Sequence, residues 1–360
     1  MKVFINYPFG NTELEARIRN KKLFSVKMEE GFNSRKILDT CLLHKEPLKF
    51  IPYLERIEQS SHNHYAVCFC SLIEKAAGMK VDYLVQVIRT IFLELERVYS
   101  HTLYLNRLFS YTENPVAINH TIAIKDALLS CFEEVTGHRM FGTNHVFGDM
   151  NFNISSGNIK FINATIEQTT LSLNKIKKIA DNNPSMISLF RDSVVITEKN
   201  ILDKKITGPF SWFKGLNQDA RSTEPHFAYA EPDVQKKLEY RKIEQNCIYS
   251  RMWRIIYDVE NSIKIVQSLL EKHSPVYQRK MVLEQPTLHK GEYSNKIESP
   301  RGIIGMDIEV DKNGIIAKIH VDSPSDINKK MLNDALNGTL VDHINLAFDS
   351  LYLSMMEIDK

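Results

Sequence analysis

Two histidines and a glutamate lie close together in the first quarter of the chain, and these residue types are common zinc ligands. Glu58 shortly precedes the segment His62-Asn63-His64. A helical zinc site places its two histidines four residues apart, so that both imidazoles project from one face. These two are separated by a single residue, and on a helix their imidazoles would point to different faces. We therefore expect core or surface histidines and no metal site.

The cysteines do not form a recognisable ligand set. An odd number without regular spacing predicts reduced thiols rather than a disulfide framework. Only Cys68 and Cys70 are close, and their one-residue gap differs from the two-residue gap of common metal or redox pairs. We expect no cluster ligation by this chain. The five cysteines are Cys41, Cys68, Cys70, Cys131 and Cys247.

Length and charge exclude several classes of protein. With 360 residues the chain has two domains or one large domain with appendages. A balance of 46 Lys+Arg against 44 Asp+Glu argues against general nucleic-acid binding, which needs a strongly basic surface. No stretch approaches the roughly 18 apolar residues of a membrane span, and the apolar run 1–5 is too short for a secretory signal. We expect a cytosolic protein that can still dock on a membrane partner.

The elements that must position any site are mainly helices. Apolar residues recur every three or four positions in the segments 51–73, 84–98, 162–180 and 252–270. Several helices with one apolar face each must bury those faces against one another, which predicts a helical bundle.

Strand patterns flank the bundle. Apolar and polar residues alternate at 23–28, and the segments 306–310 and 315–321 surround Asn313-Gly314, a strong hairpin signal. We expect an α+β protein, mainly α, with an N-terminal β unit over 1–40. A helical bundle with a long loop at 208–232 would span 41–290, and a C-terminal α+β segment with a hairpin would span 291–360.

Several motifs in order along the chain make the sequence similar to one family. This family joins the large subunit of membrane-bound nickel–iron hydrogenases with the D-type subunit of respiratory complex I. The resemblance covers essentially the whole chain. The motifs are GFNSRKI at 31–37, PYLERI at 52–57, IRTIFLELERVYSH at 88–101, TGHRM at 136–140, Gly208-Pro209 with Gly215, Asn217, Asp219, Arg221, Pro225 and Tyr229, ESPRG at 298–302 with Gly305, Pro324-Ser325, and the final Asp359-Lys360.

The hydrogenase metal ligands are absent from the matching positions. In the hydrogenases two cysteine pairs hold nickel and iron, because soft thiolates suit those metals. The aligned positions here are Glu58, Ser61, Ser354 and Glu357. All four thiolates are replaced, so we expect no nickel–iron centre and no hydrogen turnover.

The quinone pocket of complex I is also altered. Its tyrosine aligns with Gln59, a histidine aligns with Phe141, and an aspartate aligns with Tyr111. The N-terminal loop histidine has no counterpart at 6–10. Arg56 matches the arginine beside the terminal iron–sulfur cluster of the partner subunit. These changes argue against the family's usual quinone chemistry, whereas Arg56 implies that the docking surface for a cluster-bearing small subunit is retained. A quinone acceptor would need an unusual pocket.

If the fold is retained, Glu58, Ser61, Ser354 and Glu357 should converge. A cavity vacated by metal and lined by carboxylates would raise their pKa through burial and like-charge repulsion. One interpretation is a proton relay through Glu58 and Glu357, or a site for a small polar ligand. The other is a relic pocket filled by hydrogen-bonded side chains and water.

Other charged residues have two interpretations each. Arg56 and Arg89 either raise the potential of a neighbouring cluster or form ion pairs, with Glu55 or Glu94 as partners. The long loop carries Asp219 and Arg221, for which we expect a salt bridge that holds the loop against the bundle. The acidic residues and the histidine of helix 84–101 serve either structural ion pairs or a link from the site to the membrane arm.

The resemblance implies a D-type large subunit of an NADH-quinone oxidoreductase-like or energy-converting hydrogenase-related complex. Such a chain binds no cofactor itself and lies on the cytoplasmic face of the membrane. Its partners are an iron–sulfur small subunit and antiporter-like membrane subunits. Two alternatives remain: a catalytically inactive adaptor between those partners, and a soluble binder of a polar small molecule.

Overall fold

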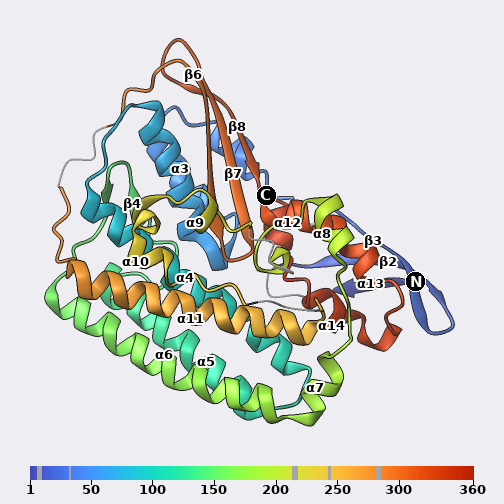
Figure 1. The fold of residues 1–360 in the computed structure, drawn as a ribbon. Coiled ribbons are helices and arrows are strands. Elements are labelled where there is room, and N and C mark those ends of the chain that lie inside the picture. The colour runs from blue at the N-terminus through green and yellow to red at the C-terminus, as the bar shows by residue number, and fades with distance from the viewer. Residues whose placement is uncertain (6–9, 32–33, 213–217, 242–244, 281–284) are drawn as a thin grey trace.

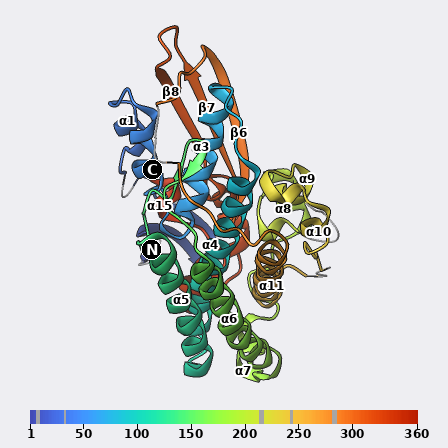
Figure 2. The same ribbon diagram turned by 90° about the vertical axis from the view of Figure 1, so that its left-hand side faces the viewer.

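The computed structural model describes residues 1–5, 10–31, 34–212, 218–241, 245–280 and 285–360. Its centre is a bundle of long helices, in which α4 packs against α5 and α11, and α5 packs against α6 (Figures 1 and 2). The sequence features at 6–9, Phe32-Asn33 and Gly215 to Asn217 lie outside the described residues. The bundle helices are α4 (Tyr83–Ser110), α5 (Pro115–Thr136), α6 (Ser156–Asn182) and α11 (Ile248–His273).

Three of these four helices follow the predicted apolar repeats. The exception is α5, whose buried stripe includes Ala117, Thr121 and Cys131. Small and polar residues on the buried face weaken the hydrophobic period, which is the main sequence signal for a helix. The overall prediction of an α+β protein that is mainly helical is confirmed.

Side-chain caps set where the bundle helices begin. Asp82 accepts a hydrogen bond from Leu84 N (2.9 Å) at the start of α4. Asn114 does the same for Ala117 N (3.0 Å) at the start of α5. Gly137, with φ of +81°, ends α5 in the left-handed conformation that glycine adopts without strain.

The helix predicted over 51–73 is interrupted. Its pieces are α2 (Ile51–Leu54) and α3 (His62–Ala76), joined by an irregular segment with one 3₁₀ turn at Gln59–Ser61. Glu58 is extended in this segment, and its carboxylate accepts a hydrogen bond from Ser60 N (3.0 Å). A short-range contact of this kind between a side chain and the backbone competes with the helical hydrogen-bond pattern. Before α2 lie α1 (Ile37–Cys41) and a 3₁₀ turn at Pro47–Phe50.

Both predicted β regions are present as three-stranded antiparallel sheets. The hairpin at Asn313-Gly314 joins β7 (Gly302–Val310) to β8 (Ile316–Asp322), as predicted. A third strand, β6 (Gly291–Ser299), was not predicted, because its alternate residues are exposed and few of the others are apolar. The N-terminal sheet is β1 (Lys2–Ile5), β2 (Thr12–Arg19) and β3 (Lys22–Met28), and a small ladder pairs β4 (His145–Val146) with β5 (Asp149–Met150).

Short helices fill the remaining segments. The helix expected near Ser325 is α12, and the loop 208–232 contains 3₁₀ turns at Pro209–Ser211 and Phe227–Ala230. The short helices are α7 (Pro184–Phe190), α8 (Glu198–Lys204), α9 (Ala220–Thr223), α10 (Pro232–Gln235), α12 (Pro324–Asn328), α13 (Leu332–Leu336), α14 (Ile344–Asp349) and α15 (Met355–Ile358), with 3₁₀ turns at Lys329–Met331 and Val341–His343.

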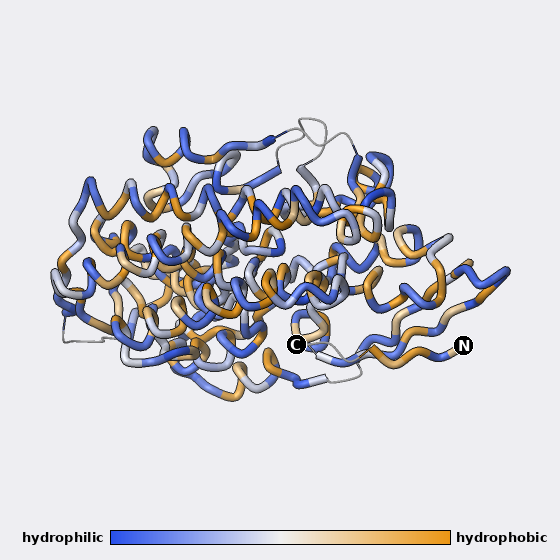
Figure 3. Tube along the Cα trace, turned by 90° about the horizontal axis from the view of Figure 1, so that it is seen from below, coloured by the Kyte–Doolittle hydropathy of each residue, from blue (hydrophilic) through white to orange (hydrophobic). Residues whose placement is uncertain are grey.

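The molecule has three hydrophobic clusters among its described residues, and two of them combine both ends of the chain. One fills the helical bundle. The second lies between α3 and the sheet β6–β8, and the third joins the N-terminal sheet to the C-terminal helices. Figure 3 shows apolar segments running through the interior of the elongated molecule. Within the ranges given above, no helix combines the length and the apolar character that crossing a bilayer requires.

Candidate functional site

Three of the four positions that align with hydrogenase cysteines lie side by side. Glu58 lies in the break between α2 and α3, Ser354 precedes α15, and Glu357 lies within α15. The Ser354 hydroxyl donates a hydrogen bond to Glu58. Glu357 accepts hydrogen bonds from Tyr65 Oη (3.0 Å) and Ser325 Oγ (2.5 Å). All of these side chains are buried.

Ser61, the fourth position, is also buried and lies in the same break. Its hydroxyl has no hydrogen-bond partner within the described part of the chain. Arg35, from the first sequence motif, fastens the break to α15. Its Nη2 donates to Ile57 O (2.8 Å) and to Met356 O (2.5 Å). Residues about 300 positions apart in sequence are thereby held at one place.

An arginine that the sequence marked only as part of a motif lies at the centre of this group. Arg301, in the turn between β6 and β7, places Nη1 3.4 Å from Glu58 Oε1 and 2.9 Å from Ser60 Oγ. Its guanidinium stacks over the ring of Tyr352 at 4.6 Å. Gly208 allows this arrangement, because a Cβ there would lie 2.1 Å from the carbonyl oxygen of Arg301. The glycine of the long loop is thus required by a close approach of two backbones.

The environment of Glu357 raises the pH at which its carboxyl group ionises, so that it lies closer to neutral. Burial raises the pKa of Glu357 to about 6, Arg301 opposes the shift, and the charge of Glu58 adds to it. The direction and the causes agree with those expected for a buried carboxylate pair. A carboxyl group with a pKa near the working pH is suited to accept and release protons.

A continuous row of buried hydrogen-bonding groups leads from Glu58 into the bundle. Tyr352 forms its middle, and its φ of +56° is a left-handed conformation that costs a residue with a side chain some strain. The sequence did not indicate a role for Tyr352 or Ser100. The successive distances are Glu58 Oε1–Ser60 Oγ 2.8 Å, Ser60 Oγ–Ser100 Oγ 3.1 Å, Ser100 Oγ–Tyr352 Oη 2.7 Å, Tyr352 Oη–His101 Nδ1 3.2 Å and His101 Nε2–Asp258 Oδ2 2.9 Å.

The row ends in a buried network of charges. Arg221 places Nη2 2.7 Å from both Asp219 Oδ2 and Asp258 Oδ1. Its Nη1 lies 3.2 Å from Glu94 Oε2. The predicted pair Asp219–Arg221 is therefore confirmed, and it ties the long loop to α4 and α11. Although burial raises the pKa of Glu94, Arg97 and Arg221 bring it down to about 2.

One acid of this region is held in its neutral form. Burial raises the pKa of Glu298 to about 8, the charge of Asp219 adds to the shift, and the hydrogen bond from Ala220 N opposes it. Glu298 Oε1 has no hydrogen-bond partner among the described residues. The carboxyl group therefore keeps its proton at neutral pH in the folded protein.

We expect the variant Glu298→Gln to be more stable than the native chain, by an amount that grows with pH. In the unfolded chain this glutamate ionises above pH 4.5, whereas in the folded chain it stays protonated until about pH 8. The native protein therefore loses stability across this window as pH rises, and the glutamine variant does not. Urea unfolding at pH 5 and pH 8 measures the difference. The exposed Glu292→Gln on the same strand is the control, and equal gains at both pH values would contradict the expectation.

The two histidines beside Glu58 share one carboxylate. His62 Nδ1 lies 2.9 Å and His64 Nδ1 2.6 Å from the oxygens of Glu96. The two imidazoles reach one carboxylate because both residues lie in the first turn of α3 and Glu96 of α4 lies at that end of the helix. There Glu96 also accepts hydrogen bonds from the free backbone N–H groups of Asn63 (2.9 Å) and His64 (3.1 Å). Both histidines are buried, as a core role requires.

The acidic, histidine and cysteine side chains of the described segments are the candidate ligands for a metal ion. No cluster of three or more of them is suited to a metal ion in the residues that the structure describes. The five cysteines are buried and free. Burial raises the pKa of the Cys68 and Cys70 thiols, which keeps them protonated.

Arg56 and Gln59 lie at the outer side of the break. Arg56 is exposed and stacks over the ring of Phe141 at 5.3 Å. It forms no ion pair with a described carboxylate; its Nη1 donates to Pro52 O. Gln59 Nε2 lies 3.8 Å from the sulfur of Met140. An exposed arginine held by an aromatic ring is available to a partner.

Arg89 has a different partner from those expected. Its guanidinium makes two hydrogen bonds to Glu74, at 3.0 and 2.6 Å, and neither Glu55 nor Glu94 takes part. Glu74 lies on α3, which faces this part of α4 in the tertiary structure. The spacing of residues along α4 alone therefore could not predict the Arg89–Glu74 ion pair. Arg89 is fully buried, which removes it from any surface that a partner protein could reach.

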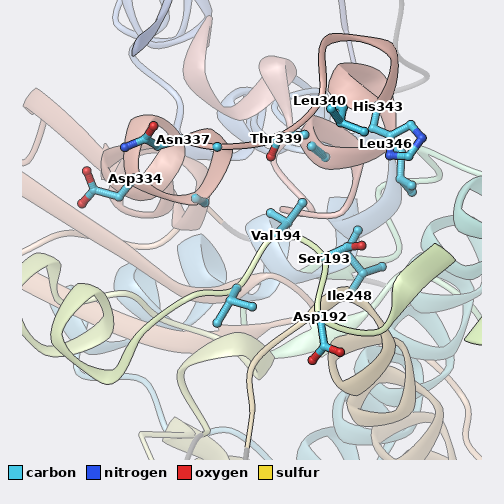
Figure 4. Close-up of a pocket in the computed structure, with 14 residues that line it drawn as sticks. Asp192, Ser193, Val194, Ile248, Asp334, Asn337, Thr339, Leu340, His343 and Leu346 are labelled. Atoms are coloured by element: carbon cyan, nitrogen blue, oxygen red, sulfur yellow. The ribbon is translucent and has the colours of Figure 1, made fainter. Parts of the chain in front are cut away.

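A surface pocket of about 480 Å³ lies apart from these residues. Figure 4 shows Ser193 and Val194 on one side of it and Thr339, Leu340 and His343 on the other. None of the buried carboxylates described above lines it. We therefore place the candidate site at the buried group around Glu58 and Arg301.

The comparisons with known proteins agree on one family of subunits. A family model described as the 49 kDa subunit of respiratory-chain NADH dehydrogenase matches residues 117–277 and 273–360. A D-type subunit of the NADH-quinone oxidoreductase of Chloroherpeton thalassium is 24% identical, over 98% of this chain and 84% of that protein. The corresponding D-type subunits of Desulfotalea psychrophila and Clostridium beijerinckii are 22% and 24% identical, each over 87% of this chain and 83% of their own length.

Proposed function

The chain belongs to the family of the 49 kDa subunit of respiratory-chain NADH dehydrogenase, and we propose that it is the large peripheral-arm subunit of a membrane-associated oxidoreductase complex. In this proposal the complex lies on the cytoplasmic face of the membrane. The chain receives electrons from an iron–sulfur cluster of a small partner protein and couples this electron transfer to an antiporter-like membrane module. A quinone is the proposed acceptor.

The buried row from Glu58 to Asp258 is the observation that carries this proposal. Hydroxyl groups both donate and accept hydrogen bonds, so a row of them can pass a proton by reversing its direction of donation. Glu58 and Glu357 stand at one end and the His101–Asp258 pair at the other. We infer that Glu58 and Glu357 are the proton-exchanging groups of the site and that Ser354 orients Glu58.

The donor set does not suit the metals of the hydrogenases. The aligned positions supply two carboxylates and two hydroxyls, and the Arg301 guanidinium lies among them. Nickel and low-valent iron are held by soft thiolates in that family. We therefore propose proton chemistry without a nickel–iron centre in this chain, and no hydrogenase activity.

The electron side of the proposal rests on Arg56. A cation near an iron–sulfur cluster stabilises its reduced form and raises its potential. Arg56 is exposed, is fixed over Phe141, and lies in the same break as Glu58. Gln59 and Ser61 would line the gap between this surface and the buried carboxylates.

A second candidate function is that of an inactive adaptor between the small partner protein and the membrane module. One observation favours it: Glu58, Ser60, Ser354 and Arg301 hydrogen-bond to one another, as the side chains of a filled relic pocket would. The adaptor would assemble normally and conduct no proton.

The test is to purify the native complex from membranes through a tag on this chain. We expect a cluster-bearing small protein and multi-spanning membrane proteins to co-purify, and the complex to reduce a quinone. Recovery of the same partners without any redox activity would favour the adaptor. Recovery of the chain without membrane partners would contradict both functions.

A further inference from the structure

The β2–β3 hairpin carries exposed apolar side chains at its tip. It projects from the body of the molecule at the right of Figures 1 and 3. Ile18 and Phe24 are 42% and 58% exposed there. Leu340, 45% exposed, joins them, because the segment after α13 pairs with the hairpin: Leu340 bridges Lys22, and Val341 N donates to Lys21 O (3.1 Å).

The same tip is strongly cationic. Four exposed cations, Arg17, Arg19, Lys21 and Lys22, form no ion pair with a described carboxylate. On the neighbouring strand, by contrast, Lys2 is paired with Glu13. The segment beside the hairpin contributes a single exposed carboxylate, Asp342, which leaves a clear positive excess.

The turn itself holds a lysine where glycine would be easier. Asn20 and Lys21 have φ values of +51° and +59°, the geometry of a type I′ turn. A lysine in the left-handed conformation carries a steric cost that glycine avoids. The turn therefore presents a charge at the extreme end of the projection. The backbone there is paired through Arg19 and Lys22, so the tip can enter an interface without exposing many free N–H groups.

We propose that this tip docks on the surface of an anionic lipid bilayer. The cations would contact phosphate headgroups, while Phe24, Ile18 and Leu340 enter the interfacial layer. A stable protein interface needs roughly 800 Å² of matching surface on each partner, whereas the exposed apolar residues of this tip are, among the described residues, only Ile18, Phe24 and Leu340. A fluid bilayer adapts to a convex tip, and its negative surface attracts clustered Lys and Arg. The inference does not depend on the redox function.

Vesicle co-sedimentation of the full chain tests the proposal. The vesicles contain phosphatidylcholine alone or with about one third phosphatidylglycerol. We expect binding to the anionic vesicles only, weakening as salt screens the charges. The triple variant Arg19→Gln, Lys21→Gln, Lys22→Gln should bind about 100-fold more weakly, since each basic residue near such a surface contributes roughly fivefold. Phe24→Ser should lose about tenfold.

Matched controls come from α6. The triple variant Lys160→Gln, Lys175→Gln, Lys178→Gln removes the same charge from another exposed surface, and Leu171→Ser removes an apolar side chain that is 67% exposed. Both should bind like the native chain. Circular dichroism establishes that each variant is folded. Equal losses in the two triple variants, or binding that ignores lipid charge, would overturn the proposal. So would a hairpin variant that keeps vesicle binding but loses an acidic protein partner from the native complex.

Discussion

Replacing Arg221 by methionine is expected to destabilise the protein by about 3–5 kcal/mol, the range seen when one partner of a buried ion pair is removed. Arg221 is 1% exposed and contacts three carboxylates, those of Asp219, Asp258 and Glu94. Without the guanidinium these negative charges face one another in the interior. Urea denaturation at neutral pH measures the change.

The control for this prediction is an ion pair on the surface. Lys264 lies 2.9 Å from Glu239, and the two side chains are 40% and 51% exposed. Lys264→Met should cost at most about 1 kcal/mol, because water and salt screen such a pair. If Arg221→Met cost no more than this, the buried network would not anchor the long loop. Arg221→Lys keeps the charge but loses the fork geometry, so an intermediate loss is expected.

The second large effect is expected from Tyr352→Phe in the assembled complex, where turnover should fall by about 10- to 100-fold. When His101 carries a proton on both ring nitrogens, with Nε2–H bonded to Asp258, the Nδ1 proton would pass to the Tyr352 oxygen while the Tyr352 proton moves to Ser100. The Ser100 proton then moves to Ser60, and the Ser60 proton moves to the Glu58 carboxylate. One proton leaves the histidine and one arrives at the carboxylate. Phenylalanine keeps the ring over Arg301 but interrupts this row at its middle.

The matched control is Tyr104→Phe. Its ring packs against Tyr352 with centroids 4.5 Å apart, but its hydroxyl donates to Ser350 O and lies outside the row. Turnover and its solvent isotope effect should be unchanged in this variant. Glu58→Gln should lower turnover at least as much as Tyr352→Phe. Normal turnover in both variants would contradict the relay and favour the adaptor. A loss of turnover in Glu58→Gln alone would support a role for Glu58 but exclude proton transfer along the row.

Local sequence signals were sufficient for three of the four bundle helices and for the C-terminal hairpin. The apolar repeats that became α4, α6 and α11 are visible because large aliphatic residues recur along the buried faces of these helices, among buried polar residues. The turn at Asn313-Gly314 has a chemical signature of its own. The signal failed at α5, whose buried face mixes small and polar residues with large apolar ones, and at β6, where alternate residues of the first half are exposed and few of the others are apolar.

The candidate site was less accessible from the sequence. The order of the motifs located Glu58, Ser354 and Glu357, but nothing nearby marked Arg301 or Tyr352 as their neighbours. Arg301 lies more than 240 positions from Glu58, and the two meet because β6 and β7 pack on α3. The shared partner of His62 and His64 was not apparent either, because Glu96 lies on α4 and meets the first turn of α3 only in the folded chain.

What the sequence determined by itself is the fold class, three of the four bundle helices, the C-terminal hairpin and the types of groups available, because periodicity and turn chemistry act between near neighbours. The replacement of four thiolates by carboxylates and hydroxyls also needed no coordinates. Only the tertiary structure decided which charges share a buried space, which of them are paired, and which carboxyl groups keep a proton. These properties depend on distance and burial, and both are set by segments that are remote in the chain.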